Sequence, residues 1–553
     1  MIARRSRSPL RAPSMAALSL ILLALVACGR GDRSRAAAGG TIVIAQTAEP
    51  ATFFPPRMSQ VPEQIVVSLL FERLAELGPE LNTIGDSGFV PALARRWQWA
   101  NDSLSIAFAL NPQARWHDGV PVRAEDVRYT FHAYTSPVVA SEGRTLLQNI
   151  DSVTVRDSLT AVFWFARRTP QQFLDATATM YILPAHLLSA IPDSTLVRAP
   201  FGRQPVGSGP FRFARWEAGS RLELVADSTR ASGRPSLDRL VFSYVPDLPA
   251  ATVKLLAGEA DFLDQVRPEG IAAIRQAPNL RLHPATELNY AFVGFNLEAR
   301  RSPLGKPGAP HPILGDMRVR RALTMATDRA TIVRSVLDSL GTVALGPAPR
   351  ALIPDTAALH PLPFDVAAAS ALLDSAGWTG RAADGTRLRG TQRLAFELLV
   401  PSSSPTRIRM SVLLQAAFKT IGVDLSVLTQ DPATLGPRID ARDFDAYLGG
   451  FQASPGLQGV RQVWTSTGSS NYQGYRSPRF DQLADSALTA FAPAVSRSLW
   501  TRAFQVAIDE APSLWLFEQS TLVAAHRRVQ FPPFRADGWF YTIPAWSVDP
   551  TQR

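Results

Sequence analysis

Alternating apolar and polar positions predict strands in the N-terminal fifth of the chain. Residues 41–46 (TIVIAQ) are rich in β-branched side chains, and the alternation between 89 and 110 places Trp97 and Trp99 on one face. Asn101-Asp102 interrupts this alternation with turn-forming residues. We therefore expect a strand at 41–46 and, within 89–110, two strands joined by a turn. Residues 48–56 contain three prolines, which exclude an α-helix there.

Apolar residues at helical spacing, often next to capping residues, predict helices along the rest of the chain. Val127, Phe131 and Tyr134 form an apolar stripe within 124–134. Further helices are expected at 317–327 after Asp316, 366–376 between Asp365 and Gly377, 407–421 before Gly422, and 479–490 after Ser477-Pro478. Strands such as 423–427 are interleaved with these helices, and this order predicts an α/β fold.

The N-terminus has the pattern of a secretory signal. Four arginines and no acidic residue lie before Met15, and residues 15–27 are apolar apart from Ser19. This run is shorter than the roughly 20 residues that cross a bilayer. It ends in Leu25-Val26-Ala27 before Cys28, the only cysteine, and resembles the lipobox of bacterial lipoproteins. We expect a signal peptide at 1–27, lipidation of Cys28, and a flexible tether at 28–40.

The composition is that of a folded protein, and part of its basic charge lies in the signal. The 553 residues suffice for three or four domain-sized units, with 46% hydrophobic and 19% charged residues. Removal of residues 1–27 lowers the formal net charge from +10 to +6. No basic stripe with interleaved aromatic residues remains, and export places the chain outside the cytoplasm, so we expect no nucleic-acid partner. The single cysteine excludes internal disulfides and Cys-based zinc sites.

Motifs of common catalytic and cofactor sites are missing from the sequence. None of the lysines belongs to a Gly-Lys-Ser/Thr loop, and Gly-x-Ser-x-Gly and Ser-x-x-Lys do not occur. No two histidines are four residues apart, as a helical metal site would require. His117-Asp118-Gly119 is typical of a tight turn rather than of a catalytic dyad. We therefore expect no enzyme activity, no metal and no cofactor. Scattered carboxylates leave a secreted hydrolase open as an alternative.

Six segments follow one another in an order that resembles a known family. They are 114–127 (ARWHDGVPVRAEDV), 205–211 (PVGSGPF), 319–329 (VRRALTMATDR), 369–377 (ASALLDSAG), 421–423 (IGV) and 471–481 (NYQGYRSPRFD). The set resembles family 5 extracellular solute-binding proteins, the dipeptide-, oligopeptide- and nickel-binding receptors of ABC importers, over about residues 41–520. Its residues are mainly structural: Gly207 and Gly209 permit positive φ at the entry to a strand, and Arg320 and Asp328 bound a helix.

The resemblance implies two α/β lobes that are joined by crossover strands and enclose a ligand-binding cleft. Lobe I is expected at 41–57, 191–285 and 511–553, an extra subdomain at 58–190, and lobe II at 286–510. Lobes of this kind close on a ligand by hinge motion.

The resemblance also suggests ligand-binding residues. In peptide-binding members, a Trp-x-x-Asp-like stretch follows a strand, and its aspartate pairs with the α-amino group of the ligand. In the matching stretch, 444–455 (FDAYLGGFQASP), Phe451 takes the aromatic place and Ser454 takes the place of the aspartate. A serine cannot form an ion pair with an ammonium group, which weakens the assignment to free peptides. Further candidates, for each of which core packing is the alternative interpretation, are Tyr290, Asn296, Trp464, Asn471 and Tyr472.

The function implied by the resemblance is capture of a peptide or similar small solute for import. The protein is expected to be a monomer on the periplasmic or extracytoplasmic face, held to the membrane by the lipid on Cys28. Its partners would be the permease and ATPase subunits of an ABC transporter. Two alternatives are a secreted envelope hydrolase and a surface sensing receptor that kept the scaffold without transport.

Overall fold

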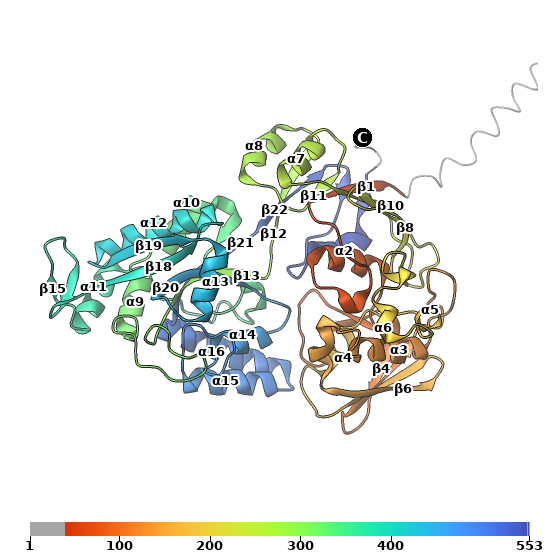
Figure 1. The fold of residues 1–553 in the computed structure, drawn as a ribbon, viewed down its shortest axis with the longest axis horizontal. Helices are drawn as coiled ribbons and strands as arrows, with labels where there is room; N and C mark the ends of the chain where they lie inside the picture. The colour runs from red at the N-terminus through yellow and green to blue at the C-terminus, as the bar shows by residue number, and fades with distance from the viewer. Residues whose placement is uncertain (1–38, 550, 552–553) are drawn as a thin grey trace, which may run out of the picture.

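A computed structural model describes residues 39–549 and 551. The predicted signal peptide, Cys28 and nearly all of the predicted tether lie outside these residues. Figure 1 shows two lobes side by side, one coloured from red to yellow and the other mainly from green to blue. Within the described part of the chain, no helix is long and apolar enough to cross a membrane.

The first lobe is built on a seven-stranded sheet whose strands come from distant parts of the sequence. β1 (Thr41–Gln46) runs parallel to both β10 (Arg239–Tyr244) and β11 (Phe262–Leu263). The order is β12-β22-β11-β1-β10-β9-β8, where β8 is Phe211–Glu217, β9 is Arg221–Ala226, β12 is Leu280–Ala285 and β22 is Thr521–His526. Helices α7 (Leu248–Leu256) and α8 (Pro268–Gln276) pack on it through Leu255 and Ile274.

A four-stranded antiparallel sheet, in the order β4-β5-β7-β6, extends the first lobe. Its strands are β4 (Ala94–Trp99), β5 (Ser105–Leu110), β6 (Ile150–Asp157) and β7 (Thr160–Phe165), and the helices around it include α2 (Val61–Leu70), α3 (Ala124–Thr135), α4 (Gln172–Thr177), α5 (Ala185–Leu188) and α6 (Asp193–Leu196). Phe108 of this part and Phe242 of the larger sheet belong to one continuous hydrophobic cluster. The subdomain therefore shares its core with the seven-stranded sheet, and its limits of 58–190 stay a prediction.

The second lobe is built on a six-stranded sheet with a hydrophobic cluster on each face. The order β14-β21-β13-β20-β18-β19 comprises β13 (Asn289–Phe295), β14 (Gly341–Thr342), β18 (Ala395–Pro401), β19 (Asp424–Gln430), β20 (Ala446–Gln452) and β21 (Ser513–Gln519). One face packs against α9 (Met317–Met325), α10 (Arg329–Leu337), α11 (Val366–Ser375) and α12 (Pro405–Thr420). The other face packs against α13 (Pro432–Asp440), α14 (Gln458–Trp464), α15 (Pro478–Thr489) and α16 (Pro493–Glu510).

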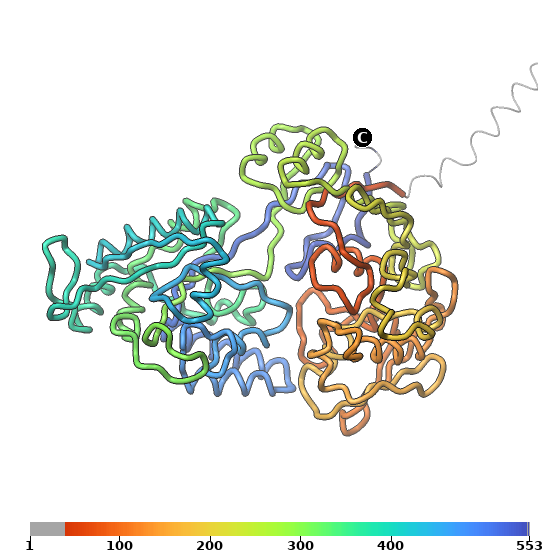
Figure 2. The backbone as a smooth tube through the Cα atoms, in the orientation of Figure 1, coloured from red at the N-terminus to blue at the C-terminus, as the bar shows by residue number. Residues whose placement is uncertain are grey.

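Two short crossovers connect the lobes, and Figure 2 shows both in the centre of the molecule. Residues 286–288 lead from β12 to β13, and Ser520 leads from β21 back to β22. The resemblance implies that 511–519 belong to lobe I, but β21 pairs with β13 and β14 in the sheet of the second lobe. The crossovers are tied together because the side chain of Asn289 both donates to the carbonyl of Gln519 and accepts from its backbone N–H, at 3.1 and 3.2 Å.

The lobes also touch at a second place, where the hairpin of α15 and α16 approaches the subdomain (Figure 1). The guanidinium of Arg168 lies 4.2 Å from the centroid of the Phe491 ring, a cation–π contact between lobes. Leu352 of the second lobe is buried within the hydrophobic cluster of the first lobe. The space between the lobes is therefore bounded by the crossovers and by this second contact.

Most predicted elements are confirmed because their signals are local. Asp365 caps α11 by accepting from the backbone N–H of Ala368, and Gly377 after the helix has φ of +85°. The strand at 41–46 has the predicted limits. The helix predicted at 407–421 begins earlier, at Pro405, because Ser404 caps it. The helix predicted to reach 327 ends at Met325, and the strand predicted at 423–427 runs to Gln430.

Two glycines of the resemblance segments have a different role from the predicted one. Neither Gly207 nor Gly209 has positive φ, so that expectation is wrong. A Cβ on Gly207 would lie 1.7 Å from the carbonyl oxygen of Leu70, and one on Gly209 would lie 2.5 Å from that of Leu69. Both positions therefore require glycine for close approach to the end of α2.

His117 connects this glycine segment to the turn that precedes α3. Its Nε2 donates to the carbonyl of Gly209 at 3.1 Å, and its Nδ1 accepts from the backbone N–H of Gly207 at 3.2 Å. These bonds require the neutral ring, and burial lowers the pKa of His117 to about 4. Asp118 interacts instead with His186, at 2.8 Å, so the structure supports the interpretation of His117-Asp118-Gly119 as a turn.

Candidate functional site

A cavity between the lobes has a volume of about 530 Å³, within the range of ligand-binding clefts. Most of its wall comes from the first lobe, and Ser454 and Pro455 contribute from the second. The predicted candidate Ser454 therefore faces the interlobe space, two residues after the end of β20.

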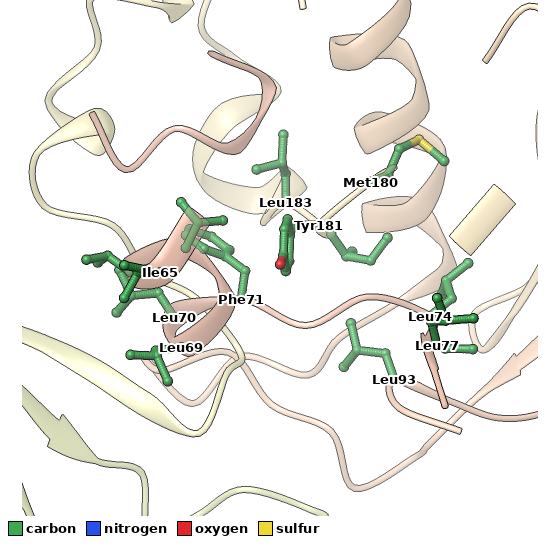
Figure 3. Packing of buried hydrophobic residues seen from close by; sticks show 14 of the residues in the cluster. Ile65, Leu69, Leu70, Phe71, Leu74, Leu77, Leu93, Met180, Tyr181 and Leu183 are labelled. Carbon is green, nitrogen blue, oxygen red and sulfur yellow. The ribbon is translucent and has the colours of Figure 1, made fainter. Parts of the chain in front are cut away.

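Aromatic and aliphatic side chains form much of this wall. Tyr134, Tyr181, Phe540 and Tyr541 line the cavity. Figure 3 shows Leu69, Phe71, Leu77 and Tyr181 within the buried cluster beneath it, and all four also reach the cavity. The guanidinium of Arg73 lies 4.1 Å from the ring centroid of Tyr181. Such a wall offers contact area to many ligands without demanding one hydrogen-bonding pattern.

The arginines of this wall are neutralised within the protein. Each pairs with a neighbouring carboxylate: Arg73 with Glu76 at 2.9 Å, Arg230 with Glu72 at 2.7 Å, and Arg535 with Asp537 at 2.8 Å. Burial raises the pKa of Glu72, and the attraction of Arg230 opposes that rise. The first lobe thus presents ion pairs rather than unpaired cations to a ligand.

A smaller cavity of about 370 Å³ lies at the edge of the second sheet from which both crossovers leave. This edge holds the carboxyl ends of β18 and β20, which run parallel, and ligands of α/β proteins commonly bind at such ends. Its lining residues include Glu287, Asn289, Tyr290, Arg407, Gly450, Phe451, Gln519 and Thr521.

Arg407 is the cation that lines this smaller cavity, and no motif in the sequence distinguishes it from other arginines. Its guanidinium donates no hydrogen bond and forms no ion pair within residues 39–549, and burial lowers its pKa. One terminal nitrogen lies 3.0 Å from where a Cβ on Gly450 would stand. The absence of a side chain at Gly450 therefore makes room for the guanidinium. A half-buried, unpaired arginine favours an anionic partner such as a carboxylate.

Phe451 and Tyr290 line the same cavity as Arg407. Phe451 stacks on Phe292, with ring centroids 5.6 Å apart. The hydroxyl of Tyr290 accepts a hydrogen bond from Nε1 of Trp464 at 3.0 Å, and Trp464 is fully buried. Trp464 therefore supports Tyr290 from the hydrophobic cluster.

The amides of Asn296 and Asn471 hold the backbone in place. Asn296 donates to the carbonyls of Arg442 and Phe444, and Asn471 to those of Thr465 and Tyr475. Both residues are buried, at 0% and 3% exposure. Tyr472 packs half-buried against the cluster of the second lobe, and its carbonyl accepts from Arg442. A ligand-binding role for these three residues stays a prediction.

Arg320 has a structural role in the segment that resembles the family. It is 5% exposed and donates to the backbone carbonyls of Leu314, Gly315, Glu510 and Ala511. Buried polar groups of this kind cost free energy unless they are paired. Arg320 thereby connects α9 to the end of α16. The resemblance segment that contains it is therefore characteristic of the fold and does not indicate where the ligand binds.

Comparison with known protein families identifies that scaffold. Residues 88–474 match the family described as bacterial extracellular solute-binding proteins, family 5 middle. The chain belongs to this family. In agreement, the chain has the two-lobed α/β fold of family 5 structures.

Similar proteins match three quarters or more of the chain. The oligopeptide-binding protein AppA of Bacillus subtilis is 23% identical over 96% of this chain and 97% of its own length. Its structure in complex with a nonapeptide has a TM-score of 0.67 and covers 93% of this chain and 99% of that one. A putative ABC transporter peptide-binding protein of Brucella ovis is 27% identical over 75% of this chain and 74% of its own length. The structure of HbpA2 from Haemophilus parasuis is 24% identical, covers 92% of this chain and all of that one, and has a TM-score of 0.77.

Proposed function

We propose that this family 5 protein captures a peptide or similar small solute between its lobes and delivers it to the permease and ATPase subunits of an ABC importer. The observation that carries the proposal is the unpaired guanidinium of Arg407, which faces a cavity beside both crossovers. A ligand carboxylate bound there would satisfy a cation that the protein leaves unpaired. The aromatic wall of the larger cavity would add contact area.

The protein binds its ligand without changing it, since a receptor for import must release its cargo intact. It acts as a monomer on the extracytoplasmic face of the membrane, anchored by a lipid on Cys28. The family assignment and the lipobox-like residues 25–28 support this location independently of each other.

Ligand titration of the wild type and one matched pair of variants tests the proposal. Small peptides are expected to raise the melting temperature of the purified protein, whereas sugars are not. Arg407→Gln removes a charge-assisted hydrogen bond worth about 1.5–3 kcal/mol, so peptide affinity should fall by roughly 10- to 100-fold. Arg409→Gln is the control because Arg409 is exposed on the same helix and does not line the cavity. Failure of every peptide to shift the melting temperature would refute the proposal.

A further inference from the structure

Glu287 supplies a carboxylate to the cavity that contains Arg407. It lies in the crossover 286–288. Its Oε1 accepts a hydrogen bond from the hydroxyl of Thr521, the residue that directly follows the second crossover at Ser520. Its Oε2 accepts a hydrogen bond from the side-chain amide of Asn289 at 3.1 Å. An ionised carboxylate has about four acceptor positions, so these two bonds fix its orientation and leave further positions available.

No cation pairs with this carboxylate within the described ranges. Glu287 and Arg407 line one cavity, yet they form no ion pair with each other. Asp264, a half-buried acid, accepts a hydrogen bond from the side chain of Gln46 at 2.9 Å. Burial raises the pKa of Asp264 to about 6, and the charge of Glu287 adds to that rise. Among the described residues that line the cavity, Glu287 is the carboxylate on the crossover side, and it has no counter-cation there.

One cavity thus holds two opposite charges, neither of which has a partner of opposite charge in the part of the chain that the structure describes. The arginine projects from α12 of the second lobe, and the carboxylate from the crossover between the lobes. Ser454, in contrast, lines the other cavity and carries no charge. A ligand with one ammonium and one carboxylate group could form an ion pair with each of these two side chains.

Building on the function proposed above, we propose that Glu287 binds the ammonium group of a short peptide with free termini, whose carboxylate meets Arg407. Glu287 in the crossover would then form the ion pair with the ligand's ammonium group that the uncharged Ser454 cannot form. Because Glu287 also accepts from Thr521, a ligand held there contacts the segments that join the two lobes. Ligand binding would then act directly on the hinge.

The test measures retention of a synthetic mixture of di- and tripeptides by the purified full chain, using native mass spectrometry. The same mixture is also supplied N-acetylated, which removes the ammonium group and keeps the carboxylate. The wild type is expected to prefer the free mixture by at least about tenfold, as the loss of one charged hydrogen bond predicts. Glu287→Gln should retain both mixtures about equally, and Ser454→Ala should keep the preference of the wild type.

Glu287→Asp guards against an effect of misfolding. It keeps a carboxylate at position 287 and should still prefer free peptides. A wild-type preference in the Glu287→Gln variant would overturn the inference while leaving the proposed function intact. Binding of neither mixture by the wild type would refute the proposed function and this inference together. Loss of the preference in Ser454→Ala would place the ammonium group at Ser454 and also overturn the inference.

Discussion

Replacement of Arg442 by methionine tests whether a buried ion pair organises the second lobe. The side chain of Arg442 is 1% exposed and that of Glu298 is 7% exposed. Arg442 donates to Oε2 of Glu298 at 2.7 Å, to the carbonyl of Tyr472 at 2.9 Å and to Oδ1 of Asn296 at 3.2 Å. Methionine fills much of the same space but makes none of these bonds.

The expected loss is large because the variant leaves buried acceptors without their donor. Removing one partner of a buried ion pair typically costs about 3–5 kcal/mol. Glu298 keeps a second bond, to Arg476 at 3.0 Å, and the side chain of Arg476 is 28% exposed. We therefore expect Arg442→Met to lower the free energy of unfolding of the second lobe by about 3 kcal/mol, near the lower end of that range.

Urea denaturation followed by amide hydrogen exchange in β13 and β20 measures this free energy for the second lobe itself. Arg301→Met is the matched control, since Arg301 pairs with Asp443 at 2.8 Å but its side chain is 74% exposed. An exposed pair contributes about 0–1 kcal/mol, so this variant should remain close to the wild type. Equal losses in the Arg442 and Arg301 variants would refute the reasoning from burial.

Three further predictions concern stability, the contact between lobes and the membrane anchor. The unfolded chain binds a proton at His117 below pH 6.5 while the folded chain does not until about pH 4, so stability should fall as pH falls through this window. In the His117→Gln variant, the free energy of unfolding measured by urea denaturation should depend less on pH, by up to about 3 kcal/mol across this window. A variant with the same pH profile as the wild type would contradict this. Arg168→Ala removes the contact with Phe491, worth about 0.5–1 kcal/mol, and should increase the radius of gyration in X-ray scattering, whereas the neighbouring Arg167→Ala should not. Cys28→Ser should release the protein from membranes in cell fractionation, and continued attachment would rule out the lipid anchor.

Helix boundaries and the family were predictable because their signals are local or repeated along the chain. Asp365 and Gly377 act on backbone groups within a few residues, so their roles follow from the sequence. Gly207 was correctly identified as important but for the wrong reason. Its requirement is space beside the carbonyl of Leu70, which is distant in sequence.

The binding site was harder to predict because its residues converge from separated segments. Placing Ser454 at the interlobe space needed only the resemblance. Asn296 is suited chemically to ligand binding, yet its amide is occupied by backbone carbonyls of 442 and 444. Arg407 resembles many other arginines in the sequence, and its burial beside a cavity, without a partner among the described residues, is visible only in the folded chain.

The sequence by itself determined the α/β class, the capped helices, the family resemblance and the lipobox-like pattern at Cys28. These features depend on periodicity and on interactions between neighbours along the chain. The tertiary structure decided which charges are paired and which are free. Arg73, Arg230 and Arg535 pair with carboxylates, while Arg407 and Glu287 line one cavity and have no partner of opposite charge among residues 39–549. The physical reason is that desolvation and pairing depend on distances between segments, and only the folded chain fixes those distances.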